Sequence, residues 1–158
     1  MDLSRKLSVA LATGLCFGYS PVAPGTVGTV WGVLLVLFLN SHLGAMAQVV
    51  CALALSICAV LICDDAEAYF GTKDDRRIVA DEYLTFPLCM VGLPAVPWLV
   101  AVAFVSHRVF DIVKPPPARR LQDLGGGLGV VADDVVSSLY SLAFNYVAWI
   151  VVSKFVSG

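Results

Sequence analysis

Long uncharged stretches alternate with short charged ones along this chain. No Asp, Glu, Lys or Arg occurs within 7–63, 83–107 or 135–153. An apolar run of about 18 or more residues has no side that faces water and is typical of a segment that crosses a bilayer. The pattern therefore predicts an all-α integral membrane protein, folded as one compact membrane-embedded domain over residues 1–158.

Proline and glycine divide the first stretch into elements. Segment 7–19 is too short to cross a bilayer comfortably, and we expect a re-entrant or interfacial helix there. The sequence SPVAPGTVGT (20–29) breaks the pattern, because its prolines and glycine do not fit together into a regular helix. Thr26 then stands at a natural N-cap for a span over 27–39, and a second span is predicted over 45–63.

The second stretch, 83–107, is interrupted by three prolines and a glycine, so GLPAVP (92–97) is predicted to be a turn between two short helices. The distribution of basic residues supports this turn. Basic clusters lie in 64–82 and 107–127, and a single crossing between them would place them on opposite sides of the membrane. A hairpin returns both clusters to the same side.

With a last span over about 133–153, the chain is predicted to be a compact bundle of about five transmembrane helices, some of them short. The uncharged connectors 40–44 and 92–97 are expected on the side opposite to the charges. Composition agrees with membrane embedding, since 14% of the residues are charged and 59% are hydrophobic. A soluble domain has about 25% charged residues. No nucleic acid is expected as a partner.

This topology gathers the carboxylates. All of the twelve acidic residues except Asp2 fall in 64–82 or 107–134, which the hairpin places on one face. Charges at a helix edge in lipid are costly unless they are paired or bound to metal. The adjacent pairs Asp81–Glu82 and Asp133–Asp134 are predicted at helix starts, where a divalent cation would relieve their repulsion. Oxygen ligands favour Mg²⁺, Mn²⁺ or Ca²⁺ over zinc.

A second group of charges lies in HRVFDIVKPPP (107–117). Arg108, Asp111 and Lys114 are spaced to follow one side of a helix that Pro115 ends. Two interpretations are open at this point. The residues could form a phosphate-binding site beside a metal, or Arg108 and Asp111 could form a surface ion pair with Lys114 as a topology anchor.

Two further features permit a phosphate site but do not require one. GGGLG (125–129) could bring its backbone close to a phosphate or could be a flexible loop. Thr26 could orient a phosphate or serve only as an N-cap. The chain has no Cys-x5-Arg loop, no Asp-x-Asp aspartyl-phosphate motif and no Ser-His triad spacing. His107 is expected to be a polar residue at a helix end. Catalysis would therefore depend on metal ions and carboxylates.

Four stretches together resemble a known family. GLCFGYSPVAPGTVGT, KDDRRIVADE, HRVFDIVKPPPAR and GGGLGVVADDVV resemble the four signature regions of phosphatidylglycerophosphatase A, in the order and at the spacing of that family. The resemblance implies a Mg²⁺-dependent inner-membrane phosphatase that converts phosphatidylglycerophosphate to phosphatidylglycerol. Thr85 and Pro116 depart from the family pattern, and neither is a candidate ligand.

The resemblance also implies roles for the matching residues. The expected catalytic residues and metal ligands are Asp81, Glu82, Asp111, Asp133 and Asp134. The expected phosphate-binding residues are Thr26, Arg108, Lys114 and Arg119. Secondary candidates are Ser20, Glu67 and Asp74.

The expected partners are a phospholipid phosphate in the bilayer and membrane lipids, with the multi-pass protein in the inner membrane and its site facing the cytoplasm. The alternatives are another phospholipid-phosphate phosphatase or transferase, or a small ion-coupled transporter. A transporter would carry its carboxylates near the middle of its spans.

Overall fold

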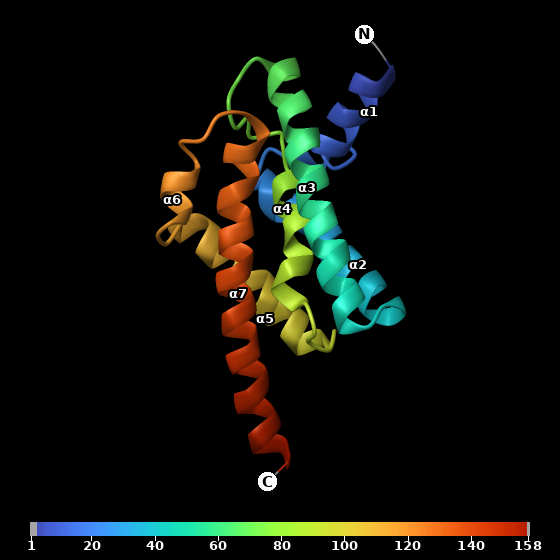
Figure 1. The fold of residues 1–158 in the computed structure, drawn as a ribbon, viewed down its shortest axis with the longest axis vertical. Helices are drawn as coiled ribbons and strands as arrows, with labels where there is room; N and C mark the ends of the chain where they lie inside the picture. The colour runs from blue at the N-terminus through green and yellow to red at the C-terminus, as the bar shows by residue number, and fades with distance from the viewer. Residues whose placement is uncertain (1–2, 158) are drawn as a thin grey trace.

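The computed structural model describes residues 3–157, and every regular element in that range is helical (Figure 1). The elements in chain order are α1 (Leu3–Ala12), η1 (Phe17–Tyr19), α2 (Pro24–His42), α3 (Ala45–Phe70), α4 (Ala80–Thr85), η2 (Phe86–Met90), α5 (Pro97–Val113), α6 (Ala118–Leu121) and α7 (Gly126–Ser157). This confirms the predicted all-α class.

Three helices in the described chain, α2, α3 and α7, are long and apolar enough to cross a membrane. The predicted total of about five transmembrane helices remains a prediction. Two of the long helices extend beyond the predicted spans into charged sequence. Helix α3 continues through Asp64 and Asp65 to Phe70 and ends where Gly71 adopts a left-handed conformation with φ 69°. Helix α7 begins at Gly126, so Asp133 and Asp134 lie about two turns inside it rather than at its start.

The predicted turn at 92–97 is confirmed, because η2 ends at Met90 and α5 begins at Pro97. This turn lies against the last turn of α2 and the first turn of α3, on either side of the connector between them. The Asn40 side-chain amide donates to the Leu93 carbonyl at 2.7 Å and accepts from the Ala95 amide at 3.2 Å. Gln48 accepts from the Gly92 amide at 3.0 Å. Both uncharged connectors therefore lie at the same end of the bundle, as predicted.

Helix α4 and η2 occupy the middle of the bundle, where they pack against α2, α3 and α7 (Figure 1). Small residues on α2 make this close packing possible. A Cβ atom at Gly28 would lie 2.6 Å from the Cβ of Val79, and one at Gly32 would lie 2.6 Å from the Cβ of Phe86. The glycines thus let the backbone of α2 approach the short central helices.

The N-terminal segment forms the ten-residue helix α1, followed by a turn and η1. Ten helical residues extend about 15 Å, roughly half the hydrocarbon core of a bilayer, so α1 is too short to span. It packs against α3 at the charged end, where Ser8 donates a hydrogen bond to Asp65 at 2.8 Å. The Tyr83 hydroxyl also bonds to the Leu11 carbonyl at 2.9 Å. This segment therefore buttresses the end of the bundle that carries the charges.

Candidate active site

Five parts of the chain line one cavity of about 340 Å³, and four of them contribute charged side chains. The N-terminus of α2, the loop between α3 and α4, α4 itself, the C-terminal part of α5 and the second and third turns of α7 meet here. The charged lining residues are Asp74, Arg76, Asp81, Glu82, Arg108, Asp111, Lys114, Asp133 and Asp134. We call this space the charged cavity. All five carboxylates that the sequence predicts as metal ligands line it.

Glu82 is held in place by three contacts. Its carboxylate accepts a hydrogen bond from Arg108 at 2.5 Å and one from the Thr29 hydroxyl at 2.9 Å. It also lies directly against Gly25, where a Cβ atom would come within 1.7 Å of Oε1. Arg108 reaches Asp111 at 3.1 Å as well, which confirms that these two residues share one side of α5. Arg108 therefore links α4 to α5.

Lys114 forms the second ion pair of the charged cavity. It ends α5 in a left-handed conformation, with φ 49°, and its amine donates to Asp133 of α7 at 2.6 Å. Burial lowers the pKa of Lys114, but the hydrogen bond and the charge of Asp133 outweigh burial and raise it above its usual value. Lys114 is therefore positively charged at neutral pH and fixed beside the carboxylates.

Three carboxylate oxygens in the charged cavity are buried and lack a hydrogen-bond partner within the described residues: Asp81 Oδ1, Asp133 Oδ1 and Asp134 Oδ1. The lining also contains six acidic side chains but only three basic ones. Buried acceptors and an excess of negative charge are costly unless a cation is present. No group of three or more His, Cys, Asp and Glu side chains in residues 3–157 is arranged as a coordination sphere. The donor set is nonetheless of the type that a hard divalent cation prefers.

Two of the predicted phosphate-binding residues, Thr26 and Arg119, do not line the cavity. Thr26 is not an N-cap, because α2 begins at Pro24 with Ala23 as its N-cap, and Thr26 does not line the cavity. The first turn of a helix tolerates proline because its amides have no helical partner, so the predicted break extends less far than expected. Arg119 is exposed on α6 and also lies outside the lining.

The secondary candidates have mixed positions. Asp74 lines the cavity, and Glu67 orients it by accepting a hydrogen bond from the Asp74 amide at 2.6 Å. Ser20 bonds to the Val22 carbonyl at 2.9 Å and does not line the cavity. His107 is fully buried against Phe86 rather than placed at a helix end.

The glycine-rich segment is not a flexible loop, because it begins a helix from Gly126 onward. Gly126 begins α7, and the Gly127 amide donates to Asp64 at 3.1 Å. A Cβ atom at Gly127 would lie 2.1 Å from the Val60 carbonyl oxygen. These glycines therefore allow α7 to pack closely on α3, and Asp64 occupies the amide that a phosphate would need.

Two residues that line the charged cavity or contact its side chains are not predicted from the sequence. Thr29 supplies the hydroxyl that contacts Glu82, and Arg76 adds an exposed positive charge to the lining. The PGTVGT sequence contains two threonines, and only the start of α2 determines which one faces Glu82. Arg76 lies between other charges in a loop, where sequence pattern gives no direction to a side chain.

Comparison with known proteins places these residues in a family context. The family model described as phosphatidylglycerophosphatase A matches residues 10–149. A protein of Bacteroides thetaiotaomicron named putative phosphatidylinositol-3-phosphatase is 31% identical over 92% of this chain and 96% of its own. Proteins named phosphatidylglycerophosphatase A from Haemophilus influenzae and Escherichia coli are 31% and 32% identical, over 84% and 86% of this chain and 82% and 80% of their own. No solved structure matches the chain.

Proposed function

Because the chain belongs to the phosphatidylglycerophosphatase A family, we propose that it is a membrane-bound phosphatidylglycerophosphatase whose active site is the charged cavity. The observation that carries this proposal is a set of ion pairs at the cavity, in which Arg108 pairs with Glu82 and Asp111, and Lys114 pairs with Asp133. The reaction is hydrolysis of a phosphate monoester. A water oxygen bonds to phosphorus, the bond from phosphorus to the headgroup oxygen breaks, and that oxygen takes up a proton.

In this proposal the basic residues hold the phosphate. Lys114 places a charged amine beside Asp133. The Nε of Arg108 is buried and has no hydrogen-bond partner within the described residues, so it retains a donor for a phosphate oxygen. Arg76 at the exposed rim adds attraction for an approaching anion.

The carboxylates would hold Mg²⁺. Asp81, Asp133 and Asp134 supply the unpaired oxygens, and Asp111 completes the acidic lining. Bound Mg²⁺ supplies positive charge against the charge that develops on the phosphoryl oxygens. Glu82 differs from Asp81, Asp133 and Asp134 because it has no buried unpaired oxygen within the described residues, and both Arg108 and Thr29 donate to its Oε2. Glu82 therefore acts chiefly by fixing Arg108.

We also propose that the charged cavity faces the cytoplasm from the inner membrane. The basic residues Lys73, Arg76, Arg77, Arg108, Lys114, Arg119 and Arg120 belong to the charged end, whereas Lys154 lies in the last turn of α7 at the other end. An excess of Lys and Arg at one end is typical of the cytoplasmic side. This orientation lets the phosphate remain at the interface while the acyl chains stay in the bilayer.

A phosphate-release assay tests the proposal. Purified protein in detergent should release phosphate from phosphatidylglycerophosphate with Mg²⁺ and lose that activity when the metal is chelated. Asp134→Asn and Lys114→Ala should abolish release while the protein still folds and unfolds cooperatively. Lys114→Ala should also lower the unfolding temperature, because it leaves the buried Asp133 carboxylate unpaired. Asp123→Asn, which changes an exposed carboxylate outside the cavity, is the matched control and should retain activity. Wild-type turnover in Asp134→Asn and Lys114→Ala would refute the site.

One observation favours a second substrate. The Bacteroides relative is named for an inositol lipid phosphate rather than a glycerol one. Both substrates carry a phosphate monoester on a lipid headgroup, which is the part that the basic residues would bind. Parallel assays with the two lipids decide between them, and faster release from phosphatidylinositol 3-phosphate would reassign the substrate without moving the site.

A further inference from the structure

An apolar groove runs along the outside of the bundle between α2 and α5. Its volume is about 560 Å³, and its walls include Val30, Val33 and Leu37 from α2 and Val100, Phe104 and Val105 from α5. None of the groove's lining residues is charged. Several of these side chains, including Val30, Leu37 and Val105, are largely exposed.

The groove and the charged cavity are both lined by residues of α2 and α5. On α5, Arg108 follows Phe104 by four residues and Asp111 follows it by seven, so all three lie on one face of the helix. On α2, Pro24 and Gly25 line the cavity, and the groove begins at Val30, about two turns further along. The space between α2 and α5 is therefore polar at one end and apolar along the rest.

The distance along α5 from Arg108 to the far end of the groove matches half a bilayer. Its lining on α5 begins at Pro97, eleven residues before Arg108. At 1.5 Å per residue this separation is about 16 Å. The hydrocarbon core is about 30 Å thick, so one leaflet contributes about 15 Å. A lipid with its phosphate in the cavity could therefore lay one acyl chain along the whole groove.

We propose that the α2–α5 groove binds one acyl chain of the lipid whose phosphate occupies the charged cavity. This inference rests on the proposed function and adds the route by which the substrate lies across the protein. The groove holds the chain parallel to α5, which orients the phosphate toward Lys114 and the carboxylates.

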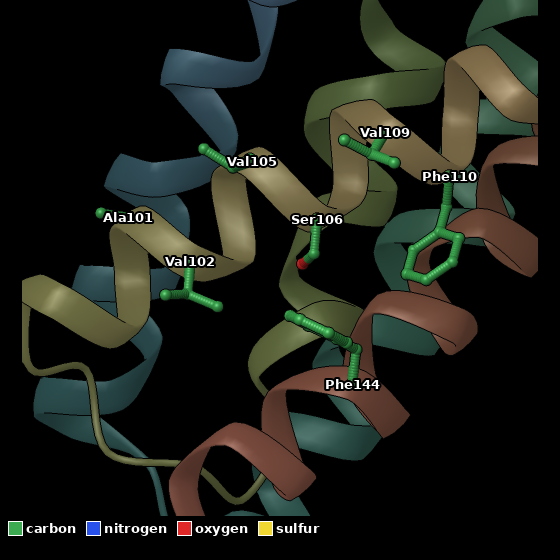
Figure 2. Close-up of a pocket in the computed structure, with 7 residues that line it drawn as sticks. All are labelled: Ala101, Val102, Val105, Ser106, Val109, Phe110 and Phe144. Carbon is green, nitrogen blue, oxygen red and sulfur yellow. The ribbon is translucent and has the colours of Figure 1, made fainter. Parts of the chain in front are cut away.

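A second apolar groove on the other side of α5 provides a comparison. It has a volume of about 480 Å³ and lies between α5 and α7, with Val102 and Phe144 on its walls (Figure 2). The Phe110 ring closes the end of this groove that is nearer the charged cavity. Its centroid lies 5.6 Å from that of the Tyr140 ring, on which it stacks, and 6.5 Å from that of Phe144, which it meets edge to face. Ala101 and Val105 border both grooves. The α5–α7 groove is thus similar in chemistry but separated from the charged cavity by aromatic rings.

Two substitutions of equal size distinguish the grooves. Val33→Trp fills the α2–α5 groove and Val102→Trp fills the α5–α7 groove. Each is assayed on long-chain phosphatidylglycerophosphate in mixed micelles and on a short-chain analogue dissolved as monomers. Val33→Trp should lower kcat/KM for the long-chain lipid by about 10- to 100-fold, because a displaced chain misplaces the phosphate. It should leave the short-chain value within about twofold of wild type, which also shows that the variant is folded. Val102→Trp should change neither.

Three results would overturn the inference: equal losses on both substrates, equal losses in both variants, or no loss in Val33→Trp. If wild-type protein hydrolyses neither lipid, the proposed function fails, and binding is tested directly by photo-crosslinking. A diacylglycerol phosphate with a diazirine at the middle of one chain should label α2 within 30–37. An excess of lipid phosphate monoester should compete for this labelling, and phosphatidylcholine should not. Equal competition by both lipids would mean that ordinary bilayer lipid covers the groove.

Discussion

The contact between Gly25 and Glu82 yields a sharp prediction about how the charged cavity is assembled. A Cβ atom at Gly25 would lie 1.7 Å from Glu82 Oε1 and 2.5 Å from its Cδ. Contacts shorter than 3.0 Å essentially never occur for real Cβ atoms, so in Gly25→Ala the carboxylate oxygen must retreat by about 1.3 Å or α2 must shift away. A hydrogen bond tolerates only about 0.5 Å of variation. The contacts of Glu82 with Arg108 and Thr29 would therefore be strained or broken.

The expected cost follows from the burial of this pair. Leaving one partner of a buried ion pair without the other costs about 3–5 kcal/mol, and partial exposure of Glu82 and Arg108 favours the lower end of that range. Gly25→Ala should therefore lose about 3 kcal/mol of stability. It should also lower phosphate release, because Arg108 would no longer be held in place by Glu82. Thermal unfolding in detergent and phosphate release measure the two effects.

Gly44→Ala is the matched control for this prediction. Both glycines lie at the start of a long helix: Gly44 directly precedes the first residue of α3, and Gly25 directly follows the first residue of α2. A Cβ atom at Gly44 would meet nothing within 4 Å. Gly44→Ala should cost no more than about 1 kcal/mol of stability, because an N-cap prefers Gly to Ala, and should leave turnover unchanged. Equal unfolding temperatures and equal turnover in Gly25→Ala and Gly44→Ala would refute a role for this contact.

Three further predictions test individual contacts. Thr29→Val keeps the shape of the side chain but removes the hydrogen bond to Glu82, so it should reduce stability by about 1.5–3 kcal/mol and lower turnover. The control Thr26→Val should change neither stability nor turnover. A larger effect at Thr26 than at Thr29 would restore the assignment made from the sequence. Asn40→Ala removes two hydrogen bonds between the last turn of α2 and the turn at 92–97, and should lower stability by about 1–2 kcal/mol without changing turnover. A loss of turnover at an unchanged unfolding temperature would contradict this prediction. The hydrogen bond from Arg77 holds the pKa of Asp75 below its usual 3.8. The contact therefore stabilises the loop above pH 3.8 and is lost as the pH falls through the lowered pKa. Hydrogen exchange of the Arg77 amide in the wild type, measured relative to Asp75→Asn, should accelerate on acidification, and identical pH profiles in the two proteins would exclude the contact.

The sequence predicted the helical class, the turn at 92–97 and the carboxylates that line the cavity, because each depends on a local pattern of charge or proline. It failed where a helix end depends on tertiary contacts. Helix α7 begins seven residues before Asp133 because Gly127 packs on α3 and its amide bonds to Asp64. Hydropathy cannot register such a contact. The choice between Thr26 and Thr29 likewise depended on the exact start of α2.

The arrangement of the charged cavity follows from conflicting demands on a lipid phosphatase. Phosphate and its counter-ions need water, whereas acyl chains need the bilayer, so the site must lie where helices end. Here the N-termini of α2 and α4 and the C-terminus of α5 meet, while α7 brings Asp133 and Asp134 in from its interior. The ion pairs Glu82–Arg108 and Lys114–Asp133 link these helices, and they also neutralise part of the positive charge of the cavity. An acidic excess therefore faces an anionic substrate, and such a site can attract phosphate only when a cation offsets it. The proposed Mg²⁺ would thus be needed to bind the substrate as well as to cleave it.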